Sequence, residues 1–234
     1  MQGPILDGVP LSLQDAVTRH WQNFVDKADS TTITELKAQP PLFWQQLAHV
    51  LACSDFVGSQ CMINTSWLPA LTEDLQQSYP QRHYHHRLAQ QLNDVDSETL
   101  LHSRLRRFRN REMIRIVWRD LCRQAELEET TRDLSELADA CIDQALQWLY
   151  RWACSNWGTP YSRAKEGQPA QAQQMVVQGM GKLGAQELNL SSDIDLIFSF
   201  PKNGETRDGK RCLDNQTFFN RLGQKLIQAL DNNT

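Results

Sequence analysis

The sequence of 234 residues contains no run of about eighteen consecutive apolar residues, which is what a membrane-spanning helix needs. Its first residues have neither a basic start nor an apolar stretch of signal-peptide length, so we expect a cytoplasmic protein that is neither exported nor membrane-bound. The six cysteines include no C-x-x-C pair, which disfavours a zinc ribbon, a thioredoxin-like site and a compact disulfide framework. We expect most of them to be small core residues.

Charge of one sign is not in large excess either. The chain has 24 Lys and Arg against 28 Asp and Glu, and hydrophobic residues make up 40%. This balance excludes a collagen-like, a low-complexity or a mainly disordered chain, and the mild acidity argues against nucleic acid as a partner of the whole chain. The length suffices for one large domain or two small ones with a sizeable core.

The first two thirds of the chain have a helical pattern, because apolar residues recur three or four positions apart up to about Trp157. Two long packed helices are predicted from two apolar stripes: Leu105, Phe108, Met113, Ile116, Val117 and Leu121, then Leu134, Leu137, Cys141, Ala145, Trp148 and Leu149. Shorter helices are predicted over 11–27, 41–53 and 55–61, with breaks near Pro40, Pro69 and Pro80.

The composition changes after Trp157. Glycine, proline and polar residues over 158–173 predict a linker or loop. Two short apolar runs, one ending at Gly179 and one over 194–198, predict buried strands, and 214–230 predicts a helix with Asp214 as its N-cap. We therefore predict an α+β fold, mainly helical, with a helical region over 1–157, the linker, and a sheet-containing core over 174–234. Two strands are marginal by themselves, which indicates a domain cut off partway.

The second predicted strand carries two carboxylates, Asp193 and Asp195. A period of two places both on one face, while Ile194 and Leu196 point into the core. Paired carboxylates suit a hard divalent cation such as Mg²⁺, which in phosphoryl transfer is commonly held together with substrate phosphates. The simpler interpretation is a solvated strand edge or an N-cap. We favour a metal site, because like charges this close are destabilising unless something positive lies between them.

A glycine-rich turn precedes these carboxylates. Gly179 and Gly181 allow the backbone to approach a phosphate closely, and Lys182 can add positive charge. Together with Gly184 they also spell G-x-G-x-x-G, the dinucleotide-binding pattern. That alternative requires a full crossover helix and an acid at the end of the second strand, whereas here the acids stand at its start. We therefore favour a metal and phosphate site.

The segment GMGKLGAQELNLSSDIDLIFSFP resembles the nucleotidyltransferase signature of the bifunctional glutamine synthetase adenylyltransferase/adenylyl-removing enzyme family, within the DNA polymerase β-like superfamily. Four other segments resemble the same family in the same order: SDFV, LRRFRNREMIRIVW, WGTP and LDNQTFFNRLGQKLIQALD. The resemblance covers most of the chain and points to the N-terminal, adenylyl-removing half. It implies that the strands belong to an incomplete mixed sheet of the polymerase β type.

The resemblance also implies an activity: phosphorolysis of AMP from the adenylylated tyrosine of glutamine synthetase, giving ADP, whereas the other half of the family's enzymes adenylylates using ATP. Asp193 and Asp195 would be the first two metal ligands, for Mg²⁺ or alternatively Mn²⁺. Gly181, Lys182 and Ser192 would line the phosphate-bearing pocket. The implied partners are glutamine synthetase, the signal-transduction protein PII, nucleotide and phosphate.

One part of the family's site is not among these residues. Its third carboxylate lies in a later segment resembling VDMRLRP, which this sequence lacks. We therefore expect a truncated adenylyl-removing domain with little or no activity in isolation. Ala185 stands where glycine is expected, which would matter only if its φ were positive. The alternative is a non-catalytic helical binding module with a degenerate nucleotide site.

Two further clusters invite a functional interpretation. Eight arginines between Arg104 and Arg123 could form a nucleic-acid face, but we favour a solvated helix face that pairs with Glu112, Asp120 and nearby acids. His83, His85 and His86 could suggest a metal site. No carboxylate or cysteine completes it at close spacing, so we favour an exposed polar helix.

Overall fold

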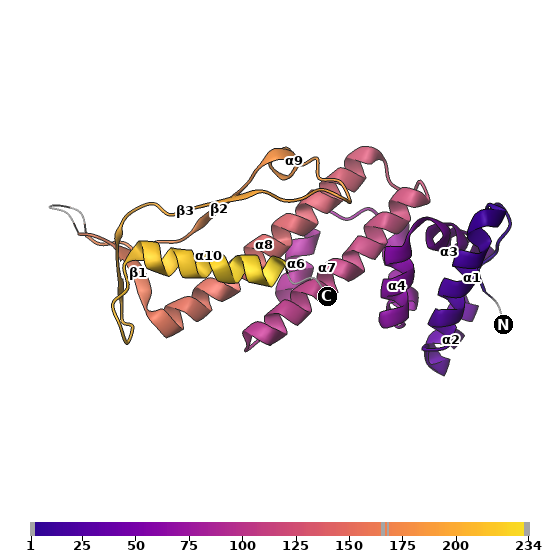
Figure 1. Ribbon diagram of the computed structural model, residues 1–234, viewed down its shortest axis with the longest axis horizontal. Coiled ribbons are helices and arrows are strands. Elements are labelled where there is room, and N and C mark those ends of the chain that lie inside the picture. The colour runs from indigo at the N-terminus through magenta and orange to yellow at the C-terminus, as the bar shows by residue number, and fades with distance from the viewer. Residues whose placement is uncertain (1–2, 165–166, 168, 232–234) are drawn as a thin grey trace. The chain divides into compact units, whose positions relative to one another are not determined.

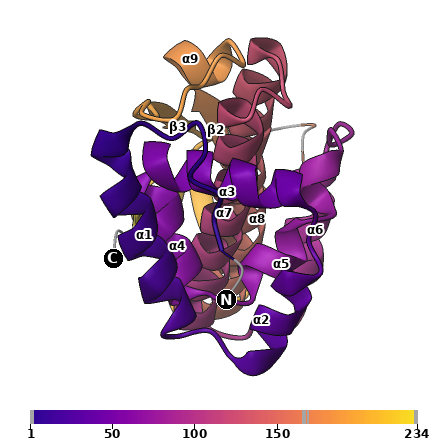
Figure 2. The same ribbon diagram turned by 90° about the vertical axis from the view of Figure 1, so that its right-hand side faces the viewer.

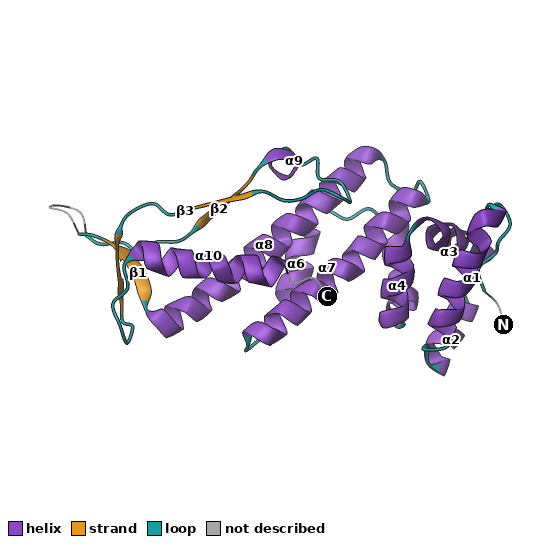
Figure 3. Ribbon diagram, in the orientation of Figure 1, coloured by secondary structure: helices purple, strands orange, loops and turns teal. Residues whose placement is uncertain are grey.

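The computed structural model describes residues 3–164, 167 and 169–231. These residues are mainly helical with a few short strands, which confirms the predicted mainly helical α+β class (Figure 3). The chain divides into two compact units, unit 1 comprising Met1–Pro80 with Asn110–Leu134 and unit 2 comprising Gln81–Arg109 with Ser135–Thr234. Both units contain parts of two long helices, α7 (Glu98–Leu121) and α8 (Leu127–Trp157). The domain ranges predicted from the sequence differ from these units and stay a prediction.

Unit 1 begins with short helices, as the apolar spacing predicts. They are α1 (Leu11–Val25), α2 (Ser30–Lys37), α3 (Pro41–Cys53), α4 (Asp55–Ile63), α5 (Trp67–Leu71) and a 3₁₀ turn, η1 (Asp74–Gln76). The predicted breaks near Pro40 and Pro80 are confirmed, whereas the break at Pro69 is wrong. Pro69 lies in the first turn of α5, where the backbone N–H that proline lacks would have no helical partner.

The core of unit 1 is apolar and rich in aromatic rings. Trp44 of α3 is almost fully buried and meets the ring of Trp21 edge to face at 5.4 Å. Phe43 stacks on Trp118 of α7 at 5.4 Å. Figure 2 shows α1, α3 and α4 together in this unit, where α1 packs against both of the others. The aromatic residues therefore serve core packing, as their helical spacing indicates.

On successive turns of α7, Arg115 and Arg119 are buried in unit 1 and Arg111 is partly buried, which corrects the predicted solvated face for these three residues, although Arg111 does pair with Glu112 as expected. Arg111 donates to Asp74 at 2.6 Å, and Arg119 donates to Glu129 at 2.7 Å. Arg115 is fully buried, donates to Asp133, and also donates to two backbone carbonyls. Because these charges have partners inside the unit, they do not form a nucleic-acid face.

Unit 2 contains α6 (His83–Gln91), parts of α7 and α8, and α10 (Asn215–Asp231). The second predicted stripe is confirmed, since its six residues are buried along α8. Asp214 caps α10 as predicted, because its carboxylate accepts the N–H of Thr217 at 2.9 Å. In α6, His83 and His85 are partly buried rather than exposed, and His85 Nε2 lies 4.0 Å from Asp143.

The strands of unit 2 form two antiparallel pairs. Strand β1 (Thr159–Ser162) pairs with β4 (Gly204–Arg207), and β2 (Val176–Gly179) pairs with β3 (Leu196–Ser199). The described residues therefore do not form the mixed sheet that the family resemblance implies. The predicted loop after Trp157 contains β1, because pairing with a distant polar segment outweighs the loop signals of Gly158 and Pro160.

The β2–β3 hairpin lies over α8 and α10 (Figure 1). The ring of Phe198 faces Gly223 of α10, and Phe200 stacks on Phe219 at 4.7 Å. The opposite face is open within the described residues, since Val176 is 47% and Ile197 48% exposed. The prediction of two fully buried strands is therefore wrong for one face of the hairpin.

No helix in the described part of the chain is both long enough and apolar enough to cross a bilayer. All six cysteines are free thiols. Cys61 and Cys141 are buried, whereas Cys53 and Cys212 are exposed, so the expectation of core cysteines holds for only part of the set.

Candidate functional site

The predicted site residues gather at one end of the β2–β3 hairpin. Gly179 ends β2 opposite Leu196, the first residue of β3. One residue further on, the N–H of Met180 donates to the carbonyl of Asp195 at 2.9 Å. The glycine turn and the carboxylate segment therefore lie next to each other at this end of the hairpin, although about fifteen residues of chain separate them.

The turn is compact because glycines stand where side chains would collide. Gly181 has a φ of +54°, which favours glycine. A Cβ at position 184 would lie 2.6 Å from the carbonyl oxygen of Gly179. Ala185 has a φ of −86°, so alanine in place of the family's glycine causes no backbone strain.

This geometry also decides against dinucleotide binding. The segment between β2 and β3 contains only α9 (Gly181–Gly184), a helix of 4 residues, and the two strands are antiparallel. The dinucleotide site needs a full crossover helix between parallel strands. In this chain the glycine spacing serves the tight turn.

Asp193 and Asp195 lie just before β3 and are both exposed. This corrects their predicted place inside a strand. Strand pairing ends at Asp195 because the segment paired with it, which follows β2, turns away at Gly181 into α9. Ile194 is 40% exposed and therefore does not enter the core as predicted. Neither carboxylate makes a hydrogen bond or ion pair within the described residues, and both are exposed to solvent.

The two side chains predicted to contact phosphate, those of Lys182 and Ser192, differ in whether they already have hydrogen-bond partners. Lys182 is exposed on α9 and makes no ion pair with the residues that the structure describes. The hydroxyl of Ser192 donates to the side-chain oxygen of Asn189 and accepts the Asn189 N–H at 3.3 Å. Ser192 therefore shapes the loop before the carboxylates, and its proton is already in use.

Two residues of α8 hold this loop, and sequence reasoning missed both. The buried hydroxyl of Ser135 accepts the N–H of Leu188 at 3.1 Å, and Asp139 accepts from the side chain of Gln186 at 3.1 Å. Leu183 and Leu188 are buried beside these contacts. A small polar residue at a buried position of α8 is the one sequence signal that could have indicated this anchor.

The donor set suits a hard cation in part. Two exposed carboxylates offer the oxygen ligands that Mg²⁺ prefers, and Mg²⁺ commonly takes its remaining ligands from water and phosphate. No cluster of three or more His, Cys, Asp or Glu side chains suited to a metal occurs in the described portion of the chain. These residues therefore fit two positions of a shared metal and phosphate site.

Comparison with known proteins shows the family of the chain. The family model for glutamate-ammonia ligase adenylyltransferase matches residues 44–234. The chain therefore belongs to this family of transferases, whose members are adenylyltransferases.

Its relatives include the bifunctional glutamine synthetase adenylyltransferase/adenylyl-removing enzyme of Pseudomonas putida, which is 50% identical over 99% of this chain. Enzymes of the same name from Pseudomonas aeruginosa and Shewanella oneidensis are 48% and 42% identical over 99% and 95% of it. The chain spans only 22% to 24% of the length of these three relatives.

Proposed function

We propose that this chain belongs to the half of a bifunctional adenylyltransferase that removes AMP from glutamine synthetase by phosphorolysis. The observation that carries the proposal is the hairpin end, where Met180 pairs with Asp195 and so places the glycine turn beside two solvent-facing carboxylates. The names of the relatives support glutamine synthetase as the substrate protein. Nucleotide, phosphate, the regulator PII and a cytoplasmic location remain parts of the proposal that the family resemblance suggests.

In this proposal Asp193 and Asp195 hold Mg²⁺, or alternatively Mn²⁺. When bound, the cation neutralises charge on the transferred group and on the leaving phenolate. The backbone at Gly179 and Gly181 admits a phosphate closely, and Lys182 adds a positive charge. Ser192 orders the loop through Asn189 and can still accept a hydrogen bond.

The reaction exchanges one P–O bond for another. An oxygen of inorganic phosphate attacks the phosphorus of the AMP group, the bond from phosphorus to the tyrosyl oxygen breaks, and ADP leaves. The tyrosyl oxygen takes up a proton from the medium or from the attacking phosphate. The chain's own contribution is to orient the two phosphates and to offset the repulsion between their negative charges.

The third carboxylate implied by the resemblance is not among the 234 residues. We therefore propose that these residues alone do not turn over adenylylated glutamine synthetase. Robust release of ADP from that substrate by this chain with Mg²⁺ and phosphate would contradict this. A non-catalytic binding module remains the competing hypothesis, because the described residues gather only two carboxylates at the site.

Calorimetric titration of Mn²⁺ in the presence of ADP tests the site. We expect binding by the parent chain and its loss in the double variant Asp193→Asn/Asp195→Asn. The matched control is Asp7→Asn/Asp15→Asn, which removes the same charge from two other exposed positions. Equal binding by both double variants would rule out the assigned ligands, and no binding by the parent would favour the non-catalytic module.

A further inference from the structure

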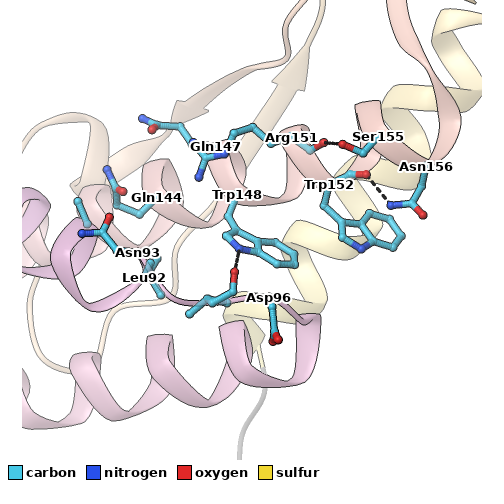
Figure 4. Close-up of a pocket in the computed structure, with 12 residues that line it drawn as sticks. Leu92, Asn93, Asp96, Gln144, Gln147, Trp148, Arg151, Trp152, Ser155 and Asn156 are labelled. Atoms are coloured by element: carbon cyan, nitrogen blue, oxygen red, sulfur yellow. Dashed lines mark hydrogen bonds between the residues drawn. The ribbon is translucent and has the colours of Figure 1, made fainter. Parts of the chain in front are cut away.

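A groove in unit 2 is separate from the hairpin site. It has a volume of about 540 Å³ and runs along α8 from Gln144 to Asn156, with its other wall formed by the end of α6 and the chain that follows (Figure 4). The twelve residue-to-residue steps from Gln144 to Asn156 rise about 18 Å at 1.5 Å per step. An extended chain rises about 3.3 Å per residue, so the groove has the length of a segment of five or six residues.

The floor of the groove is aromatic and held in place. The indole N–H of Trp148 donates to the carbonyl of Val95 at 2.9 Å, which fastens the opposite wall to α8. The ring of Trp152 lies 4.5 Å from the ammonium of Lys225 and meets Trp157 edge to face at 5.4 Å. Because both rings have fixed neighbours, the groove offers a preformed apolar surface.

Polar side chains with unused hydrogen-bonding capacity line the walls. The carboxamides of Asn93 and Gln144 have no partner within the described residues, and each can both donate and accept. Gln147 donates to Asp143 and Asn156 donates to a backbone carbonyl, which leaves their carboxamide oxygens available. Paired donors and acceptors of this kind match the N–H and C=O groups of an extended peptide.

Opposite charges stand across the groove. In the view of Figure 4 the indole ring of Trp148 lies between Arg151 of α8 and Asp96 of the opposite wall. Neither charge has an ion-pair partner among the residues that the structure describes. A phosphate ligand fits poorly here, because Arg151 is the groove's one cationic lining residue and Lys225 is already bound to Glu98 at 2.6 Å.

We propose that this groove binds an extended peptide segment of a partner protein. The segment presents an acidic side chain to Arg151 and a basic side chain to Asp96, while its backbone bonds to the carboxamides. An apolar side chain of the segment rests on Trp152. The site is independent of the proposed metal and phosphate chemistry.

Selection from a phage-displayed library of random heptapeptides on the full chain tests the proposal. We expect enrichment of peptides that carry one acidic and one basic residue in a constant order. A synthetic copy of an enriched peptide, labelled with fluorescein, should bind the variants Arg151→Glu and Asp96→Lys at least about tenfold more weakly, since each variant replaces an attraction by a repulsion. The control Arg19→Glu changes an exposed arginine of α1 and should leave the affinity unchanged.

The double variant Arg151→Glu/Asp96→Lys sharpens the test. It should select peptides with the acidic and basic residues in reversed order. Both positions are solvent-exposed, and circular dichroism with thermal unfolding will verify that the variants fold. Absence of enrichment over a blank surface, or equal affinity of all variants, would overturn the proposal, as would binding of fluorescent ADP that only Arg151→Glu abolishes.

Discussion

The guanidinium of Arg115 donates to the carboxylate of Asp133 at 3.0 Å, and the side chains are 0% and 4% exposed. The same guanidinium donates to the backbone carbonyls of Asp74 and Gln77, and it lies over the ring of Tyr79. One side chain of α7 thus satisfies acceptors from two other segments of unit 1. The burial of this charge is tolerable because the partners surround it.

We predict that Arg115→Met destabilises the chain by about 2–4 kcal/mol, because two backbone carbonyls would lose their donor and the buried carboxylate of Asp133 would keep only the half-exposed Arg132 at 3.1 Å. The control Arg104→Met breaks an exposed pair with Asp94 and should cost at most about 1 kcal/mol. Urea unfolding followed by circular dichroism measures both. A cost for Arg115→Met no larger than for the control would contradict the network's role in unit 1.

Gly58 of α4 provides the second prediction. A Cβ at this position would overlap the ring of His20, whose Nε2 is hydrogen-bonded to Asp55 at 2.9 Å. Gly58→Ala should therefore cost about 1–3 kcal/mol through overpacking, despite alanine's better helix propensity. In the background His20→Ala the same substitution should be neutral or stabilising. Additive effects in this double-mutant cycle would show that the ring is not the obstacle.

Two adjacent positions of the hairpin turn should respond in opposite ways. Gly184→Ala would push against the carbonyl oxygen of Gly179, so we expect a cost of about 1–3 kcal/mol and a clear loss of Mn²⁺ affinity. Ala185→Gly changes a residue of ordinary φ and should leave Mn²⁺ binding unaltered. Calorimetric titration and thermal unfolding of the two variants provide the comparison. Equal Mn²⁺ affinities would mean that the turn does not shape the site.

Acid stability should depend on Asp214. Hydrogen bonds from the hydroxyl and then the N–H of Thr217 lower the pKa of this carboxyl below its ordinary value of 3.8. A lowered pKa in the folded chain means that the stabilisation is complete above the unfolded pKa and is lost as the pH falls through the folded one.

Asp214→Asn keeps a capping side chain but removes this titration. We therefore expect its melting temperature to fall less steeply than that of the parent between about pH 4 and pH 2. Thermal unfolding monitored by circular dichroism across this range measures the slope. If the melting temperatures of the two proteins fell equally steeply with pH, the Asp214 carboxylate would not contribute to acid stability as proposed.

The long helices could be predicted because their apolar stripes are local and periodic. The internal pairing of Arg111 and Arg115 could not, since their partners Asp74 and Asp133 lie 37 and 18 residues away in the sequence. An arginine-rich helix with distant partners has the same local pattern as one with a solvated face. Strands β1 and β4 were missed for a similar reason, because short polar strands depend on a remote partner.

The candidate site was predicted in its residues and only partly in its geometry. The motif indicated Asp193, Asp195 and the glycine turn, and the hairpin does bring them to one end. The motif contained no information on where the strand begins, because pairing depends on the turn at Gly181. It also contained nothing about Ser135, whose part in the site arises only through tertiary packing.

The bond between Ser135 and Leu188 has a consequence for protein engineering. Ser135 is fully buried in a helix, and a stabilisation scheme based on helix propensity would replace it with alanine. That exchange would improve the helix and at the same time leave the N–H of Leu188 without its acceptor. A more heat-resistant α8 could therefore come with a loosened loop before Asp193, and libraries that screen for thermostability alone would select against the order of the candidate site.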